Sequence, residues 1–358
     1  MIRCAFYAPL KHPEHPVPSG DRTLARAILS ALKTAGHNVE IASDFQSRDG
    51  VGNPATQADR QLQAKALLPQ LISKGAAAGW QAWITYHNYY KAPDLLGPDV
   101  SAALGIPYVL IEATRARKRL TGPWAHYAKL AEEATDAAAT VFYLTRRDAE
   151  SLVAYAPEGQ RHVHLAPFLP AIELPARSSG NAKILSVGMF RPGDKLASYE
   201  IIAETLALLQ IPNWHISIAG GGPAEPEIRA LMSPFDNNVS WLGACDADQM
   251  HSAYDEAGIL FWPGVNEAFG MTYLEAQAAG LVAVAQDRPG VRDVLAPGMH
   301  RPAPEEGPAA LAGQIDRLLN NPAVRDEAGL KARNYVEKHH LLASASRVLD
   351  TELKALLS

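Results

Sequence analysis

The sequence has little cysteine, no long apolar run and no excess of basic residues. Only two cysteines occur in 358 residues, Cys4 and Cys245. They form no metal-ligand pattern, so we interpret them as reduced thiols. No apolar run approaches the roughly 20 residues of a membrane span, and a net charge of −5 argues against nucleic acid as the main partner. Residues 1–9 are typical of a first strand rather than a signal peptide, so we expect a cytoplasmic protein.

Length and patterning indicate two α/β domains. A chain of 358 residues exceeds the usual single-domain size, so two domains of about 150–180 residues are expected. Strand-like and helix-like segments alternate in the first half, with strands expected at 4–8, 39–42, 82–86, 108–111 and 139–144. In the second half, strands are expected at 183–187, 215–219, 239–242, 259–262 and 282–285, and helices at 198–209, 226–232, 246–256 and 269–279. Such alternation predicts parallel sheets wrapped by helices.

A proline-rich segment marks the domain boundary. Residues 167–180 (PFLPAIELPARSSG) carry three prolines and end in Ser-Ser-Gly, which is typical of an interdomain linker. We therefore expect a first domain over 1–168, a linker over 169–181 and a second domain over 182–335. The remainder, 336–358, is expected to be a C-terminal helix whose leucines pack on a neighbour.

The stretch 262–280 (WPGVNEAFGMTYLEAQAAG) is predicted to join a buried strand to a helix. The preceding run, 258–262 (GILFW), is short and apolar throughout, as a fully buried strand would be. From Phe269 onward, apolar residues recur at helical spacing. Gly280 stands where a left-handed C-cap belongs.

Two glutamates on this stretch suit a long anionic ligand. Glu267 lies in the loop before the helix and Glu275 on the helix itself, roughly 7 Å along the axis at about 1.5 Å per residue. Free N–H groups at a helix start receive phosphate or hydroxyl oxygens, and an ionised carboxylate accepts two hydroxyl donors. The alternative is a helix-start acid plus a solvated glutamate. The small residues that flank Glu275 argue against it.

The run from Glu267 to Glu275, with its Phe-Gly pair, resembles the E-x7-E signature of the retaining, nucleotide-sugar-dependent glycosyltransferases of group 1 (family four). The resemblance implies the GT-B fold, in which two Rossmann-like doubly wound domains face a cleft. It implies that the C-terminal helix, 336–358, packs back on the N-terminal domain. It also implies that Glu275 holds the ribose of the donor. The donor sugar would be held by Glu267 and the residues that follow it, Ala268, Phe269, Gly270 and Met271.

Two cations, Arg191 and Lys195, follow the first strand of the second domain in the loop GMFRPGDK. Cations at a strand exit form charge-assisted hydrogen bonds to a diphosphate; two solvated surface charges are the alternative. The resembling family has an Arg and Lys pair here that stabilises the leaving nucleoside diphosphate. This sequence departs from that pattern, since Met189 stands where the family commonly has Arg. Gly243 belongs to a segment that, by the same resemblance, lies near the nucleobase.

Three candidates lie in the first domain. Gly20, in the loop 17–22, brings its backbone near a ligand, and the loop resembles the family's glycine-rich loop; a plain helix N-cap is the alternative. His87 closes the strand 82–86, where the family has a catalytic His, although a lone His often only satisfies a local hydrogen bond. Glu112 stands where related enzymes often carry a His, which leaves its role open.

Residues 113–120 (ATRARKRL) form a basic cluster. Such a cluster is expected to meet an anionic acceptor or a membrane surface, and a solvated basic loop is the alternative. Its cations are Arg115, Arg117, Lys118 and Arg119.

Two other motifs exclude competing chemistry. Gly220-Gly221-Gly222 lacks the third glycine of a dinucleotide fingerprint, which disfavours a nicotinamide oxidoreductase. Asp246-Ala247-Asp248 is interpreted as a helix start rather than a metal site.

The sequence therefore predicts a retaining glycosyltransferase that uses a nucleoside-diphosphate sugar as co-substrate, with no further cofactor. The acceptor would be a glycan, a lipid-linked sugar or a small molecule. Since cations and helix starts neutralise the leaving phosphate, a divalent metal is not required. The expected catalytic residues are Glu267, Arg191, Lys195 and His87. Two alternatives stay open: a nucleotide-sugar epimerase of the same fold, and a non-catalytic nucleotide- or glycan-binding module.

Overall fold

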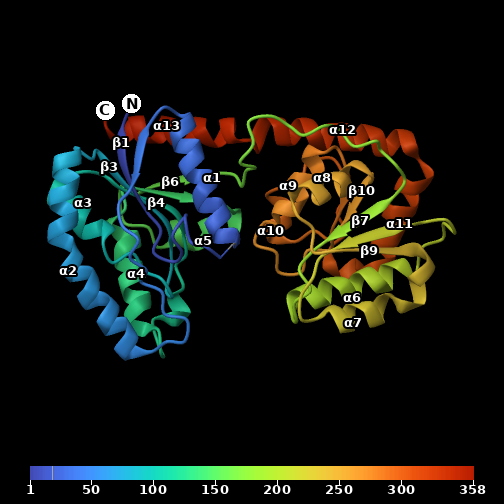
Figure 1. The fold of residues 1–358 in the computed structure, drawn as a ribbon, viewed down its shortest axis with the longest axis horizontal. Helices are drawn as coiled ribbons and strands as arrows, with labels where there is room; N and C mark the ends of the chain where they lie inside the picture. The colour runs from blue at the N-terminus through green and yellow to red at the C-terminus, as the bar shows by residue number, and fades with distance from the viewer. Residues whose placement is uncertain (18) are drawn as a thin grey trace. The chain divides into compact units, whose positions relative to one another are not determined.

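The computed structural model describes residues 1–17 and 19–358 and divides them into two α/β units. The first unit comprises Met1–Ala166 and Leu342–Ser358, and the second comprises Pro167–Leu341. Each unit contains one parallel sheet with helices packed around it (Figure 1). The predicted class, two doubly wound α/β domains, is confirmed.

The sheet of the first unit has six strands in the order β2-β1-β3-β4-β5-β6, and all neighbours are parallel. The chain runs from β1 to β2 on one side and then returns to β3 on the other side of β1. In such sheets ligands bind beyond the carboxyl ends of the strands at the point of reversal, here between β1 and β3. The strands are β1 Arg3–Tyr7, β2 Asn38–Ile41, β3 Ala82–Asn88, β4 Tyr108–Ala113, β5 Thr140–Tyr143 and β6 Arg161–His164.

The last helix of the chain is part of the first unit. It lies beside α1 in Figure 1 and contacts it directly. His37 and Asp350 approach within 3.3 Å, and Arg161 pairs with Glu352 at 2.6 Å. The helices of this unit are α1 Gly20–Thr34, α2 Pro54–Ala78, α3 Gly97–Leu104, α4 Ala125–Ala137, α5 Arg146–Ala154 and α13 Leu342–Leu356, with the short 3₁₀ turn η1 Arg117–Arg119.

The sheet of the second unit has five parallel strands in the order β11-β10-β7-β8-β9. Here the chain builds β8 and β9 on one side of β7 and then reverses to place β10 and β11 on the other. The point of reversal therefore lies between β7 and β10. The strands are β7 Ile184–Val187, β8 Ile216–Ala219, β9 Val239–Gly243, β10 Ile259–Phe261 and β11 Val282–Val284.

The proline-rich segment expected as a linker lies along the second unit. The N–H of Ser178 donates to the carbonyl of Ala279 at 2.8 Å, and the N–H of Leu169 donates to the carbonyl of His340 at 2.8 Å. The helices of this unit are α6 Asp194–Leu206, α7 Glu225–Met232, α8 Ala247–Asp255, α9 Met271–Ala278, α10 Pro289–Arg292, α11 Gly307–Asn320 and α12 Pro322–His339, with 3₁₀ turns η2 Ser233–Asn238 and η3 Pro304–Glu306. Within the described part of the chain, no helix combines the length and apolarity that a membrane crossing requires.

Two helix starts differ from the prediction by two residues or more, and both follow a glycine. Helix α6 begins at Asp194 rather than at 198, and α9 begins at Met271 rather than at Phe269. Each helix follows a glycine at positive φ, Gly193 at 81° and Gly270 at 66°. That conformation is incompatible with a right-handed helix, so the helix begins after it.

The predicted end of α9 is confirmed. Gly280 has φ 86°. Its N–H donates to the carbonyl of Gln277 at 2.9 Å, and the N–H of Leu281 donates to the carbonyl of Ala276 at 2.9 Å. These two bonds form a Schellman cap.

Candidate functional site

The point of reversal in the second unit brings together the two segments that the sequence singled out. Strand β7 leads into the loop 188–193 and helix α6, and β10 leads into the loop 262–270 and helix α9. Because β7 and β10 are neighbours, both loops leave the same edge of the sheet side by side. This edge is where ligands bind in doubly wound sheets.

An ion pair joins the two loops. Lys195 Nζ contacts Glu267 Oε1, and the indole N–H of Trp262 donates to the same oxygen at 2.9 Å. The Lys195 ammonium also lies 5.2 Å from the ring centroid of Trp262, within the range of a cation–π interaction. The side chains of Lys195 and Glu267 are 24% and 13% exposed, so ligand atoms have access to a largely desolvated pair of opposite charges.

Lys195 does not lie on a loop, contrary to the prediction. It is in the first turn of α6, between two residues that hold the Glu267 loop. Ser198 Oγ accepts from the N–H of Val265 at 3.2 Å, and Asp194 Oδ1 accepts from Asn266 Nδ2 at 2.9 Å. The start of α6 thus fixes the position of Glu267 through its two preceding neighbours.

The loop stores backbone strain next to Glu267. Asn266 has φ 48°, a conformation that costs non-glycine residues on the order of 1–3 kcal/mol and concentrates at functional sites. The hydrogen bond to Asp194 holds Asn266 in that conformation. This strain supports a functional assignment of the loop that the sequence pattern alone could not make.

Both helices that flank the ion pair lack a side-chain cap at their start. The residues that precede them, Gly193 for α6 and Gly270 for α9, have no side-chain oxygen to accept from the first N–H groups. Gly270 is also required by space, because a Cβ there would come within 2.7 Å of the Tyr273 ring. Uncapped N–H groups and the positive helix ends are favourable for phosphate oxygens.

Glu275 has one protein partner and an open side. It is exposed on α9, and its Oε2 accepts from the hydroxyl of the buried Tyr254 on α8 at 2.8 Å. The protein packed around its carboxylate raises the pKa of Glu275, and the Tyr254 hydroxyl partly lowers it. The tyrosine fixes the direction of the carboxylate. Because the side chain is exposed, its other acceptor positions are open to a ligand.

The other expected donor-binding residues are accessible. Arg191 is exposed, and no described residue forms an ion pair or hydrogen bond with its side chain. Ala268 is exposed, and its carbonyl packs so closely on Gly290 that a side chain there would collide with it. Gly243 is exposed at φ 69°, and its carbonyl accepts from the N–H of Gly220 at 2.8 Å. Phe269 packs partly on the core, and Met271 begins α9.

The first unit has a polar pair at its own point of reversal. His87 lies near the carboxyl end of β3, and Asp21 lies at the start of α1, which follows β1. His87 Nδ1 and Asp21 Oδ1 are 3.0 Å apart. Gly20 begins α1 and is exposed, with no atom within 4 Å of the position that a Cβ would take. Pro18, part of the loop singled out from the sequence, lies outside the described residues.

His87 and Glu112 are both held in left-handed backbone conformation, with φ 67° and 61°. They lie opposite one another on β3 and β4, between the register pairs Tyr86–Ile111 and Asn88–Ala113. Glu112 Oε2 is buried and has no hydrogen-bond partner among the described residues. Strained backbone at two residues that lie opposite one another is typical of a functional site.

Charge coupling links His87 to its carboxylates. Burial disfavours the imidazolium, but the charges of Glu112 and Asp21 outweigh it and raise the pKa of His87. Burial raises the pKa of Glu112, against the opposing effect of His87. The hydrogen bond from His87 lowers the pKa of Asp21. His87 therefore holds its proton above its ordinary range, as a hydrogen-bond donor to substrate would need.

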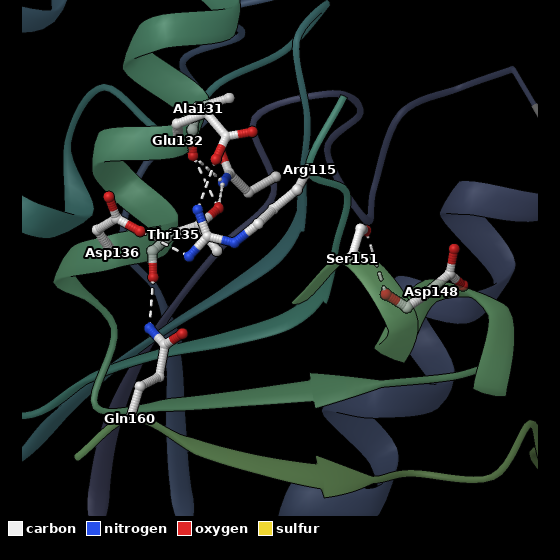
Figure 2. A network of polar contacts seen from close by, with 9 residues as sticks. Arg115, Ala131, Glu132, Thr135, Asp136, Asp148, Ser151 and Gln160 are labelled. Atoms are coloured by element: carbon white, nitrogen blue, oxygen red, sulfur yellow. Dashed lines mark hydrogen bonds and ion pairs between the residues drawn. The ribbon is translucent and has the colours of Figure 1, made fainter. Parts of the chain in front are cut away.

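The prediction that Arg115 belongs to an exposed basic cluster is wrong. Its side chain is 1% exposed, and its guanidinium pairs with Glu132 at 2.5 Å and Asp136 at 2.6 Å, both on α4 (Figure 2). These two carboxylates neutralise it inside the first unit. Arg117 and Lys118 are exposed and Arg119 is half-buried, so the basic cluster is reduced to these three.

Several residues of the site escaped the sequence analysis. Trp262, Tyr254 and Asp21 each contact an expected site residue. Asp194 and Ser198 act one step away, because they hold the two residues that precede Glu267. A glycine followed by Asp at the head of α6 was the available signal for Asp194. Tyr254 gave none, because only the fold brings it to Glu275.

Comparison with known proteins agrees with this geometry. Residues 175–335 match the family model of the glycosyl transferases group 1. These residues include the Lys195–Glu267 pair, both uncapped helices and Glu275. The part of the chain that carries these residues is therefore similar to the glycosyl transferases group 1.

Curated relatives align along most of the chain. The phosphatidyl-myo-inositol mannosyltransferase of Mycolicibacterium smegmatis is 26% identical, covering 94% of this chain and 91% of that protein. The D-inositol 3-phosphate glycosyltransferase of Arthrobacter sp. (strain FB24) is 23% identical, covering 96% and 92%. The resemblance thus extends across both units of this chain.

Solved structures show the same fold. HepE from Anabaena, in complex with UDP, superimposes with a TM-score of 0.72 at 14% identity, covering 99% of this chain and 100% of that chain. Sucrose-phosphate synthase from Thermosynechococcus elongatus gives 0.67 at 17% identity, covering 99% of each. The two α/β units match the GT-B architecture of such glycosyltransferases.

Proposed function

We propose that this protein is a retaining glycosyltransferase that moves a sugar from a nucleoside-diphosphate sugar to an acceptor hydroxyl. One observation carries the proposal: the Lys195–Glu267 ion pair lies between two uncapped helix starts at the point of reversal of the second sheet. A diphosphate needs cations and free N–H groups, and a sugar needs a carboxylate for its hydroxyls. This arrangement supplies all three within one unit.

Donor binding exchanges the partners of the ion pair. The diphosphate oxygens take Lys195, Arg191 and the first N–H groups of α6 and α9, and Glu267 turns to the sugar hydroxyls while Trp262 holds its orientation. Glu275, directed by Tyr254, accepts the ribose hydroxyls. Ala268, Phe269, Gly270 and Met271 line the sugar through their backbone, and Gly243 lies toward the base. Gly20 leaves its backbone N–H open to a ligand of the first unit.

The transfer breaks the bond between the sugar C1 and the β-phosphate oxygen and forms a bond from C1 to the acceptor oxygen on the same face. The acceptor's proton goes to the departing phosphate oxygen, and the nucleoside diphosphate leaves. Lys195, Arg191 and the helix starts stabilise the charge that develops there, so a divalent metal is not required. Glu267 is engaged by Lys195 and Trp262 and serves to position the sugar, and His87 donates a hydrogen bond to substrate.

The acceptor is a hydroxyl of a glycan, a lipid-linked sugar or a small polyol. The names of the matched relatives, an inositol-phosphate glycosyltransferase and a phosphatidyl-inositol mannosyltransferase, support a cyclic polyol or its lipid form. HepE has been solved with UDP and glucose, which makes UDP-glucose one of the donors to try first. None of these proteins is described as an epimerase.

A donor panel followed by product analysis tests the proposal. The melting temperature is measured with UDP, GDP, ADP and dTDP sugars, since a true ligand raises it by mass action. The donor that binds is then incubated with acceptors, and NMR assigns the product anomer. Retention supports the proposal and inversion contradicts it. Isomerised donor without acceptor would indicate the epimerase, and binding without turnover would indicate a non-catalytic module.

A further inference from the structure

Two cations and two aromatic rings form a compact group in the first unit, which we call the cation–aromatic cluster: Tyr90, Lys91, Arg119 and Trp124. Tyr90 and Lys91 follow β3, and Arg119 closes the 3₁₀ turn after β4. Trp124 precedes α4. The cluster therefore lies beyond the carboxyl ends of two neighbouring strands, on the edge where ligands bind in this kind of sheet.

Both cations share both rings. The centroids of Tyr90 and Trp124 are 5.6 Å apart, with the ring planes at 88°. Lys91 Nζ lies 5.7 Å from the Tyr90 centroid and 5.3 Å from that of Trp124. The Arg119 guanidinium carbon lies 5.3 Å and 5.4 Å from the same rings. Each distance is within cation–π range, so the rings hold two like charges close together.

No carboxylate balances these charges. Among residues 1–17 and 19–358, no acid lies within ion-pair distance of Lys91 or Arg119, nor of the adjacent exposed Arg117 and Lys118. Arg115 is the contrast, because its two terminal nitrogens pair with two carboxylates of α4 (Figure 2). An excess of positive charge held by rings rather than by acids attracts an anion.

Two donors of the cluster lack an acceptor. Trp124 Nε1 and Arg119 Nε are buried and have no hydrogen-bond partner among the described residues. Both groups donate and cannot accept, and an unpaired buried donor costs about 1–3 kcal/mol. An oxyanion that reaches these covered donors supplies an acceptor as well as the missing charge.

The cluster is supported from below. The Trp124 ring packs on Gly52, where a Cβ would come within 3.2 Å of it. The loop that carries Gly52 is fixed by Asp49, whose carboxylate accepts from the N–H groups of Gly52 at 3.1 Å and Asn53 at 2.7 Å. The N–H of Asp49 donates to the carbonyl of Lys91 at 2.8 Å. Asp49 is thus occupied by backbone and orders the cluster without neutralising it.

Ring contacts connect the cluster to His87. The His87 and Tyr89 rings are 4.7 Å apart, and those of Tyr89 and Tyr90 are 5.5 Å apart. A ligand anchored on the cluster can therefore extend along Tyr89 to the point of reversal of the first sheet, where His87 and Asp21 meet.

We propose that the cation–aromatic cluster binds a phosphate group. Arg119 offers a planar fork of donors and Lys91 a point charge, and this pair of cations suits a phosphate dianion. If the proposed function holds, the phosphate belongs to the acceptor, whose hydroxyl extends toward His87. The same group occurs on a soluble phosphorylated polyol and on a phospholipid headgroup.

The unpaired indole N–H of Trp124 provides a direct readout. The full-length protein is labelled with ¹⁵N-tryptophan, and the Trp124→Phe variant identifies the Trp124 signal among the six tryptophans. Inorganic phosphate is titrated at constant ionic strength, with chloride as the reference salt. The Trp124 signal shifts with phosphate and not with chloride. Arg119→Gln and Lys91→Gln each weaken the apparent affinity about tenfold, the effect of losing one charge-assisted hydrogen bond.

Two matched variants control this titration. Lys65→Gln removes an exposed charge of the same unit on α2 and leaves the affinity unchanged. Lys195→Gln disables the proposed donor site and also leaves the Trp124 titration unchanged, so the result does not depend on the proposed function. The proposal is overturned if the Trp124 signal does not shift with phosphate. It is also overturned if Arg119→Gln and Lys91→Gln bind phosphate with the same affinity as the wild type.

Vesicles distinguish the two sources of the phosphate. Cosedimentation is measured with phosphatidylcholine vesicles with and without phosphatidic acid. Binding that requires phosphatidic acid and is lost in Arg119→Gln assigns the site to a lipid headgroup. A phosphate-induced Trp124 shift without vesicle binding assigns it to a soluble phosphorylated acceptor.

Discussion

Lys195 and Glu267 form an ion pair although 72 residues separate them in the chain. One follows β7 and the other β10, the two strands on either side of the reversal in the second sheet. In the proposed mechanism, each side chain stands in for a ligand group before the donor binds. The Glu267 carboxylate takes the place of a phosphate beside Lys195, and the Lys195 ammonium takes the place of a polarised sugar hydroxyl beside Glu267. A site that is already neutral avoids the cost of holding a bare buried charge before the donor arrives.

The Tyr254–Glu275 contact predicts a graded effect on nucleotide binding. Glu275→Gln should weaken the affinity for the nucleoside diphosphate about tenfold, because the ribose hydroxyls lose an ionised acceptor. Tyr254→Phe should weaken the affinity less, since Glu275 keeps its carboxylate and loses only the hydrogen bond that orients it. Isothermal titration measures both, with Glu256→Gln, an exposed acid paired with Lys183, as the control. Unchanged affinity in Glu275→Gln would remove the ribose role.

Gly270 and Gly20 predict different responses of stability to substitution by alanine. Gly270→Ala should lower the free energy of unfolding by about 1–3 kcal/mol, because φ is 66° and the new Cβ meets Tyr273. Gly20→Ala should change it by no more than about 0.5 kcal/mol, since its surroundings are open. Urea unfolding compares the two. If Gly20→Ala were equally destabilising, Gly20 would be required by the fold and not by a ligand.

Replacing Arg115 should destabilise the fold, whereas replacing the nearby Arg117 should not. Arg115→Ala should lower the free energy of unfolding by about 3 kcal/mol, the lower end for a broken buried pair because Asp136 is 52% exposed. The exposed Arg117 replaced by Ala should have an effect within about 0.5 kcal/mol. Thermal and urea unfolding measure both. If both substitutions had equally small effects, Arg115 would be an exposed cation like its neighbours.

His87 predicts a pH-dependent contribution to stability. Its pKa is raised in the folded state by Glu112 and Asp21, which outweigh the opposing effect of burial. The stabilisation from the imidazolium is therefore complete below the unfolded pKa of about 6.5 and is lost as the pH rises through the folded value. The free energy of unfolding of the wild type minus that of His87→Gln should fall across this window.

NMR of the His87 ring supplies the control for that prediction. Glu112→Gln removes the carboxylate that contributes most to the raised pKa, so the pKa of His87 should fall in this variant. A His87 pKa below about 6.5 in the wild type would contradict the coupling.

Much of the fold could be predicted from the sequence because its strands are short apolar runs with helical segments between them. The strand that was missed, β6, and the shifted helix starts have local causes. β6 (RHVH) alternates polar residues and lacks an apolar run. α6 starts four residues earlier than expected because Gly193, at positive φ, permits a sharp turn into the helix.

The site was only partly predictable because its key relationships cross the chain. The spacing of Glu267 and Glu275 was visible, and so was Lys195, but their pairing depends on the order of strands β7 and β10. The strain at His87, Glu112 and Asn266 has no sequence signature, since none of them is glycine. Arg115 looked like its basic neighbours, and only the position of α4 shows that it is buried and paired.

Titration of a nucleoside diphosphate into the wild type and Lys195→Gln tests the central claim most directly. A matched control, Lys183→Gln, removes a surface lysine of the same unit that pairs with Glu256. The account predicts that the ligand chosen from the donor panel binds the wild type and Lys183→Gln equally, and Lys195→Gln at least tenfold more weakly, by the charge-assisted bonds it loses. Equal affinity for all three proteins would contradict the placement of the diphosphate between α6 and α9.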